Sequence, residues 1–426
     1  MTIEFPVIVP RLPQELYDVV MAELAADADL PESWRALCQC ALVNYSFYLR
    51  SSSHLFSDIT LIRAQEGRSP NKNTIRRLER LNDILKANPW IARRIQSCGI
   101  ETWFNTISRA PERDAVFGHN LIASILNQLP ALTHFSWINH RGMLPWSFVR
   151  ENSGLVTALH SLRARDTLRS ITWECIYGLP PSLFTTASRF AHVSLVHVQP
   201  STSAKDLIVD WQPEDNTFSP SILNICYGSS MLMSIAHGDF YMSGIFSRLQ
   251  ELHLWMRCAA EAESAASIMH AAAETLQVVV IKDLPYYSHI ADPIELISLP
   301  ALRELTLSCE LRNHAPLPSS IAALLQTRLE NSTVSPLQKL NISVHYMSCA
   351  AMPKCDGREW WDLDETLASP ALDNLEEINI EFRLSASPAM KMQNSKEPWP
   401  AAAGRSLSKT FGKFKSRIHL HASSLC

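Results

Sequence analysis

The chain has 426 residues, of which 46% are hydrophobic and 19% charged, a composition typical of folded rather than disordered protein. Its length predicts two or three domains or one elongated repeat domain, and its net charge of -4 argues against a nucleic-acid partner. No apolar run approaches the roughly 20 residues that span a bilayer, and the first residues lack a secretory signal pattern. We therefore expect no membrane partner, reduced thiols, and a location in the cytosol or the nucleus.

Three short helices are predicted near the start of the chain, after a tail of residues 1–10. The first begins at Pro13, whose missing N–H costs nothing in the first turn of a helix. Its apolar stripe consists of Leu16, Val19, Val20 and Leu24. A second helix is predicted from Pro31, a third over "ALVNYSFYLR", and a first strand from Phe56. A core of about 50 residues is marginal, so this module requires a partner or a covering neighbour.

Three sequence blocks within residues 11–61 resemble an F-box. They are "LPQEL", "CALVNYSF" and "HLFSDITL", in the order and spacing of L-P-x-E-L, C-x-L-V-x-x-S-W and L-F-x-x-I-x-L. Members of that family dock on a Skp-type adaptor, which bridges to a cullin–RING ubiquitin ligase. The resemblance implies that the adaptor-binding residues are Leu12, Pro13, Leu16, Leu42, Val43 and Phe47. The chain departs from the family pattern at Phe47, because phenylalanine keeps an aromatic anchor but lacks the indole N–H of the usual tryptophan.

A short formula then recurs along the chain: apolar, two variable, apolar, one variable, apolar. The alternation in its second half predicts a strand with one buried face. Copies begin at Ile95, Leu132, Leu168, Phe190, Ile222, Leu249, Leu276, Leu302, Leu337 and Leu375. Helix-like stretches precede most copies, as at Asn120–Leu129 and Ile321–Leu329, and another ends at Pro89. A unit of this size cannot bury its apolar face alone, whereas stacked neighbours can.

These units resemble leucine-rich repeats. The resemblance implies an α/β fold in which about ten helix–strand units form a solenoid over residues 62–385, with a parallel sheet on its concave face. None of the copies has the Asn or Cys that standard repeats place eight positions after the first leucine, so the turns must be built differently. An ordinary α/β domain with right-handed crossovers is the alternative. The order of the two segments, an F-box-like module before irregular repeats, resembles that of a large group of fungal F-box proteins.

The variable strand positions are predicted to face outward and to form a surface for a protein target. The candidate target-binding residues there are His134, Arg169, His192, Glu251, His253, Glu304, Lys339 and Glu377. Three glutamates in this set suggest an acidic row that favours a basic partner, although Lys339 interrupts it. Trp360 and Trp361 lie in a long insertion, and they either anchor that insertion or present an exposed hot spot to the target.

The segment 386–426 is predicted to be a basic, flexible tail. Its stretch "KTFGKFKSRIHLH" interleaves aromatic and basic residues, a pattern also found in weak nucleic-acid or membrane contacts. The chain contains no G-x-S-x-G, phosphate-binding loop or H-E-x-x-H motif, and its cysteines lack zinc spacing. We therefore expect no catalysis, no metal and no cofactor.

Two functions remain open from the sequence. The first is the substrate-recognition subunit of an SCF-type ubiquitin ligase, in which the F-box docks on the adaptor and the repeats bind the target. The second is a repeat scaffold outside any ligase, in which the F-box-like segment only caps the apolar end of the solenoid.

Overall fold

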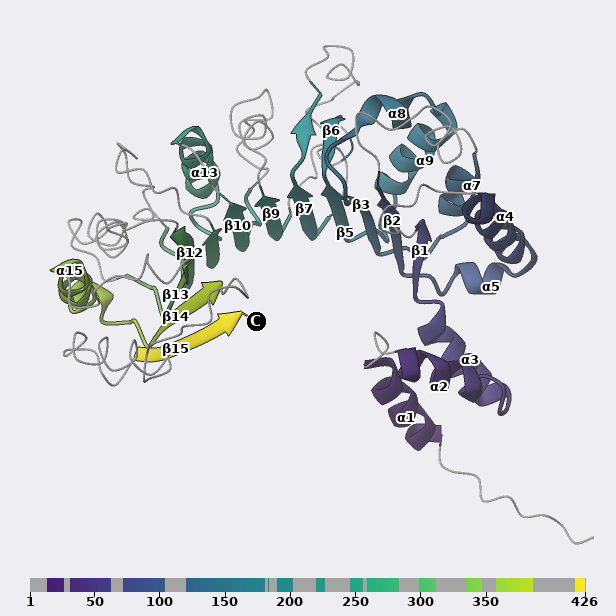
Figure 1. The fold of residues 1–426 in the computed structure, drawn as a ribbon, viewed down its shortest axis with the longest axis horizontal. Helices are drawn as coiled ribbons and strands as arrows, with labels where there is room; N and C mark the ends of the chain where they lie inside the picture. The colour runs from purple at the N-terminus through teal and green to yellow at the C-terminus, as the bar shows by residue number, and fades with distance from the viewer. Residues whose placement is uncertain are drawn as a thin grey trace, which may run out of the picture. The chain divides into compact units, whose positions relative to one another are not determined.

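Figure 1 shows the computed structural model of the chain. The described residues are 14–26, 31–62, 72–103, 120–180, 183, 190–201, 220–226, 246–255, 259–282, 299–311, 335–346, 358–385 and 418–425. They divide into two compact units, the first built mainly from residues 1–103, 108–140 and 150–162, and the second mainly from 163–426. The predicted α/β class is confirmed.

The first unit contains the N-terminal helices and a short parallel sheet in the order β1-β2-β3. Its strands are β1 (Asp58–Ile62), β2 (Ser97–Thr102) and β3 (His134–Asn139). Its helices are α1 (Gln14–Ala26), α2 (Pro31–Cys40), α3 (Tyr45–Leu55), α4 (Lys72–Ala87), α5 (Pro89–Ala92), α7 (Leu121–Asn127) and α9 (Ser153–Arg163), the last residue of which belongs to the second unit. Because β1 pairs with β2, the expected boundary at residue 61 falls inside a strand of the sheet.

The second unit is dominated by a long parallel sheet whose strands follow chain order. The order is β5-β7-β9-β10-β11-β12-β13-β14-β15. These strands are β5 (Ser170–Glu174), β7 (His192–Val196), β9 (Ile222–Cys226), β10 (Glu251–Trp255), β11 (Val278–Lys282), β12 (Glu304–Leu311), β13 (Lys339–Tyr346), β14 (Glu377–Ser385) and β15 (Ile418–Leu425). Chain-order addition of parallel strands is what stacked repeats produce.

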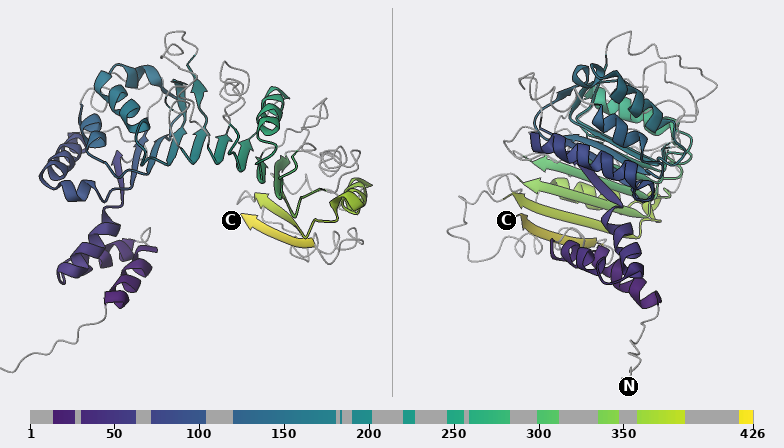
Figure 2. Two further views of the ribbon diagram at one scale, coloured as in Figure 1. Left: turned by 180° about the vertical axis from the view of Figure 1, so that it is seen from behind. Right: turned by 90° about the vertical axis from the view of Figure 1, so that its right-hand side faces the viewer.

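Helices cover one side of this sheet. Figures 1 and 2 show α13 (Ala259–Ala271) and α15 (Arg358–Leu367) on the same side. On the face toward these helices the strand side chains are buried, as Leu252 and Leu254 of β10 illustrate. The alternate residues are half-exposed on the opposite face. We call that opposite face, over β9 to β14, the open face. A 3-10 turn, η4 (Pro370–Leu372), precedes β14.

Smaller elements follow β3, β5 and β7. The short strands β4 (Leu144–Pro145), β6 (Ile176–Leu179) and β8 (Gln199–Pro200) form a separate parallel sheet, and α8 (Trp146–Arg150) follows β4. The turns into β6 and β8 use the left-handed residues Cys175 (φ 56°) and His197 (φ 51°). These strands were not predicted, because two to four residues are too few to show a period.

The turns before the strands share one hydrogen-bonding device. One carbonyl at each turn accepts two successive backbone N–H groups from the next repeat. The Gln250 carbonyl accepts from Gln277 and Val278 at 2.8 and 2.9 Å, and the Gln277 carbonyl accepts from Arg303 and Glu304 at 2.8 and 3.0 Å. The Ser57, Gln96, Arg169, Ala191, Ser221, Arg303 and Gln338 carbonyls do the same. We call this device the carbonyl ladder.

Each of the ten predicted formula copies corresponds to a strand, but one was placed in the wrong register. Leu223 and Ile225 are the buried positions of β9, so the formula begins at Pro220 and not at Ile222, which lies on the open face. The error arose because proline occupies the first apolar position. The predicted helix Ile321–Leu329 lies outside the described residues, whereas Asn120–Leu129 contains α7 and the helix before Pro89 is α4.

The predicted flexible tail needs a correction. Residues 418–425 form β15, which pairs in parallel with β14 from Ile418 opposite Ile378 to Leu425 opposite Ser385. The apolar–polar alternation at the start of "IHLHASSL" is the strand signal that the basic composition of the segment obscured. The predicted tail 1–10 and residues 386–417 lie outside the described residues.

Candidate functional site

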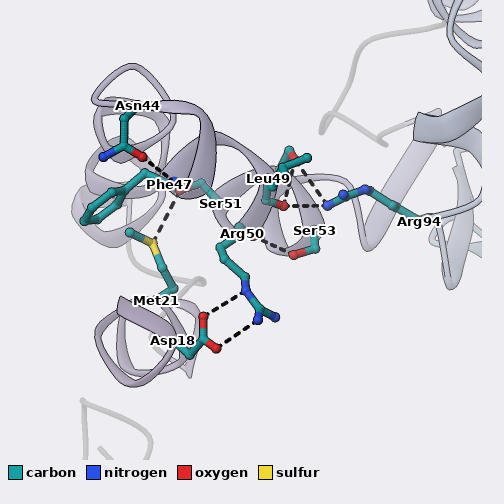
Figure 3. Close-up of polar contacts among 10 residues, drawn as sticks. Asp18, Met21, Asn44, Phe47, Leu49, Arg50, Ser51, Ser53 and Arg94 are labelled. Atoms are coloured by element: carbon teal, nitrogen blue, oxygen red, sulfur yellow. Dashed lines mark hydrogen bonds and ion pairs between the residues drawn. The ribbon is translucent and has the colours of Figure 1, made fainter. Parts of the chain in front are cut away.

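The three N-terminal helices pack around a small core. Met21 of α1 and Leu37 of α2 are buried, and so are Ser51 and Ser52 of α3. The Ser51 hydroxyl donates to the Met21 sulfur at 3.3 Å, which satisfies a buried polar group inside the module (Figure 3). The three-helix prediction is therefore confirmed at the level of secondary structure, and α1, α2 and α3 hold one another in place.

Polar contacts at the rim of the module fix the helix positions. Two nitrogens of Arg50 donate to the two carboxylate oxygens of Asp18, each at 2.8 Å, which ties α3 to α1 (Figure 3). The pair is half-exposed, so it contributes at most about 1 kcal/mol. Asn44 caps α3 because its side-chain oxygen accepts from the Phe47 backbone N–H at 3.0 Å.

The most unusual feature of this module is the apolar surface that its helices leave uncovered. Seven of the nine exposed large apolar side chains among the described residues lie between Leu16 and Tyr45. They are Leu16, Val19, Val20, Trp34, Leu42, Val43 and Tyr45, and we call them the exposed apolar set. A concentration of exposed apolar side chains is more typical of an interaction site than of an ordinary protein surface.

Two segments display this set. On α1, Leu16, Val19 and Val20 are spaced i, i+3 and i+4 and share one face, while Met21 points into the core. In the turn from α2 to α3, Leu42 is 87% exposed and Val43 is 65% exposed. This turn is hydrogen-bonded, since the Leu42 and Val43 N–H groups both donate to carbonyls of α2 at 3.0 Å. The two apolar side chains therefore project from an ordered turn.

The residues that the F-box resemblance marks have different positions in the structure. Leu16, Leu42 and Val43 belong to the exposed apolar set, and Phe47 is half-buried in α3. Leu12 and Pro13 lie outside the described residues. The motif did not mark Val19, Trp34 or Tyr45. The helical stripe of α1 was the sequence signal for Val19, whereas Trp34 is a lone aromatic residue in a polar helix and gave no periodic signal.

A second set of contacts joins α3 to α5 and to the turn before β2. Tyr48 of α3 contacts Trp90 of α5 edge-on, with ring centroids 5.8 Å apart, and the Arg94 guanidinium lies 5.4 Å from the Trp90 centroid. The same guanidinium donates to the Leu49 carbonyl and to the Ser52 hydroxyl (Figure 3). We call these residues the Arg94 junction.

The predicted target-binding residues fall in several places. Glu251, His253, Glu304, Lys339 and Glu377 all lie on the open face of the second unit. Their strands are neighbours, and one row of the register runs from Glu251 through Val278, Glu304 and Lys339 to Glu377.

Of the remaining predicted residues, His192 lies in the same row, because the register pairs His192 with Ile222 and Ile222 with Glu251. His134 begins β3 in the first unit, and its ring is 2.7 Å from the Thr133 hydroxyl. Arg169 lies in the turn before β5, and its carbonyl belongs to the carbonyl ladder. His192 begins β7, 3.3 Å from the Ser170 hydroxyl. Trp360 and Trp361 lie in α15 and not in a loop, and their side chains lie outside what the structure describes.

A chain of side-chain hydrogen bonds fixes the polar residues on the open face. The Asn341 amide donates to Glu304 at 2.8 Å and to Thr306 at 3.0 Å, and the Asn379 amide donates to Asn341 at 2.9 Å and to Glu377 at 2.6 Å. These bonds restrict the glutamate side chains and orient their carboxylates. The surface is therefore ordered before any partner arrives.

Among the described residues, no group of three His, Cys, Asp or Glu side chains is arranged to hold a metal ion, and no helix is long and apolar enough to cross a bilayer. No protein-family model matches the chain, and no curated protein matches it in sequence.

Proposed function

We propose that this protein is the substrate-recognition subunit of an SCF-type cullin–RING ubiquitin ligase. In this proposal the N-terminal helices dock on a Skp-type adaptor, and the long parallel sheet, as an irregular leucine-rich-repeat solenoid, holds the target protein. The ligase subunits would then act on a target lysine at high effective concentration.

The exposed apolar set is the observation that carries the proposal. Leu16, Leu42 and Val43 are marked by the F-box-like blocks and are also uncovered in the structure. Motif spacing and exposure therefore both point to these three side chains. Burying a leucine or valine side chain stabilises a complex by about 1.5–3 kcal/mol, so this set can supply a substantial adaptor affinity.

The decisive experiment measures binding of the purified chain to a purified Skp-type adaptor by calorimetry. We expect wild type to bind and the Leu42→Asp/Val43→Asp variant to lose at least about 100-fold in affinity, because both side chains would carry charge into an apolar contact. Ile84→Asp is the matched control, since Ile84 is 40% exposed on α4, outside the exposed apolar set. Circular dichroism establishes that each variant is folded.

Two results would contradict the proposal. One is that the folded wild-type chain does not bind the adaptor. The other is that the Leu42→Asp/Val43→Asp variant binds the adaptor as tightly as the Ile84→Asp control does.

The scaffold alternative is favoured by the Arg94 junction, because contacts from Trp90 and Arg94 attach α3 to the strand-bearing part of the first unit. If the N-terminal helices act only as a cap, deleting residues 1–55, which leaves β1 intact, should make the remaining chain insoluble. The ligase proposal predicts a soluble remainder that no longer binds the adaptor. Solubility and adaptor binding of this deletion variant distinguish the two functions.

A further inference from the structure

One strand of the open face carries two aliphatic side chains. On β11, Val278 and Val280 are half-exposed, while Val279 and Ile281 between and beyond them are buried in the core. A strand with only one buried face normally presents polar residues on the other. Two neighbouring outward valines therefore make an apolar strip, which we call the β11 strip.

Carboxylates lie on both sides of this strip. The register places Glu251 of β10 and Glu304 of β12 on either side of Val278. Because neighbouring strands are about 4.8 Å apart, the two glutamate backbones are separated by roughly 10 Å, with the valine between them. Both glutamates are half-exposed, so both can meet a partner from solvent.

The nearby lysines are engaged with other groups. Lys339 is the neighbour of Glu304 in the same row, but its Nζ lies 3.6 Å from a carboxylate oxygen of Glu377. Lys282 ends β11 with its Nζ 4.1 Å from the centre of the Trp255 ring. Two carboxylates therefore lie beside the apolar strip. Glu304 is held in place by Asn341 at 2.8 Å, and a carboxylate oxygen of Glu251 lies 3.6 Å from Nε2 of His253.

We propose that the β11 strip and its two flanking glutamates bind an arginine side chain in an extended segment of the target protein. The aliphatic stem of the arginine would lie over Val278 and Val280, and the guanidinium would bond to Glu251 and Glu304. A planar guanidinium offers donors in several directions and so bridges two separated carboxylates, whereas a lysine ammonium is a compact point charge. This inference rests on the proposed function, since it names the class of target that the repeat domain recruits.

The test selects short random peptides displayed on phage against the full-length protein. Wild type is expected to enrich peptides with an arginine beside apolar residues, and replacing that arginine by lysine or glutamine should weaken binding about tenfold or more. Glu251→Gln/Glu304→Gln should weaken the selected arginine peptides about 100-fold. Glu263→Gln/Glu274→Gln, which changes two exposed glutamates in and after α13, is the charge-matched control and should bind as wild type does.

Val280→Thr provides a second, independent variant, because it keeps the strand-favouring shape and places a hydroxyl on the outward face. It should weaken the selected peptides about tenfold without unfolding the chain. The inference is overturned if selection yields no binders, if the binders show no preference for arginine over lysine, or if the Glu251→Gln/Glu304→Gln variant binds them unchanged.

Adaptor affinity, measured on the same variants, separates this inference from the proposed function. Glu251→Gln/Glu304→Gln should bind the Skp-type adaptor normally, since these residues lie outside the exposed apolar set. Loss of arginine selectivity with intact adaptor binding refutes the inference alone. Arginine selectivity in a protein that does not bind the adaptor refutes the ligase function and leaves a basic-peptide receptor.

Discussion

Two thiols show how burial decides the chemistry of single residues. Cys98 of β2 lies in the core with none of its surface exposed, and burial raises its pKa well above the ordinary value, with Asp58 adding to the shift. Cys175 is half-buried, and burial together with Glu174 raises its pKa to about 11. Both therefore stay protonated near neutral pH, so neither is suited to act as a nucleophile or as a thiolate ligand.

The Cys98 shift predicts a loss of stability at alkaline pH. In the unfolded chain this thiol releases its proton near its ordinary pKa of 9.0, whereas the native chain retains the proton. The unfolded state then binds fewer protons, so the contribution of Cys98 to stability declines as pH rises above 9.0, by about 1.4 kcal/mol per pH unit.

Urea unfolding of wild type and Cys98→Ala, from neutral pH to about pH 10, checks this prediction. The variant lacks the titrating thiol, so its stability should fall less steeply above the thiol pKa, and other alkaline groups cancel in the comparison. Parallel stability curves for the two proteins would show that Cys98 makes no such contribution.

At the scale of elements, strands β12 to β14 are joined by side chains as well as by their backbones. Asn341 contacts Glu304 and Thr306 on one side and Asn379 on the other, so a single amide links three strands on the open face. Side-chain hydrogen bonds of this kind contribute about 1 kcal/mol each. They also keep adjacent strands in one register, because the partners meet only when the same row is aligned.

A double-mutant cycle of Asn341→Ala and Asn379→Ala tests this coupling. We expect each single change to destabilise the fold by about 1 kcal/mol and the pair to show a coupling energy of about 0.5 kcal/mol or more. Thermal and urea unfolding supply the values. Strictly additive effects would indicate that the amide–amide bond contributes nothing beyond the two separate side chains.

The strands were more predictable from sequence than their surroundings. A buried face repeats every second residue, so the apolar formula located all ten predicted strands of the repeats. It failed in register at β9, because Pro220 occupies the position that other repeats give to a large apolar residue. β15 was missed because the apolar–polar alternation of Ile418 and Leu420 gives way to a serine-rich sequence.

The candidate site was predictable only in part. Motif spacing identified Leu16, Leu42 and Val43, and the structure leaves all three exposed. Trp34 and Tyr45 were missed, because periodicity reveals which residues of a helix are apolar but not which of them a neighbouring helix covers. The β11 strip was also missed: the formula copy at Leu276 places Val278 and Val280 at variable positions, but a valine there gives no chemical signal of binding by itself.

At the scale of the whole molecule, each strand of the second unit contacts mainly the strands beside it. In such stacked architectures stability is close to a sum of repeat and neighbour contributions. Damage to one repeat should therefore spread to its neighbours and fade with distance along the sheet, unlike damage to a single globular core.

Ile342→Ala in β13 tests this expectation, because Ile342 is 1% exposed and its truncation leaves a cavity. We expect a loss of about 2–5 kcal/mol in the affected segment. Hydrogen exchange measured by mass spectrometry should show faster exchange in β12, β13 and β14, with β5 and β7 unchanged. Uniform loss of protection across the second unit would show instead that it unfolds as one cooperative body.

The carbonyl ladder has a consequence for how such a protein can evolve. The Gln250 and Gln277 carbonyls are equivalent at successive turns, because each accepts hydrogen bonds from two N–H groups of the repeat that follows. A chain lacking residues 251–277 would present Val278 to the Ser221 carbonyl that now receives Glu251. Recombination between equivalent turns can therefore lengthen or shorten the open face in steps of one strand, about 4.8 Å each, without redesigning a turn.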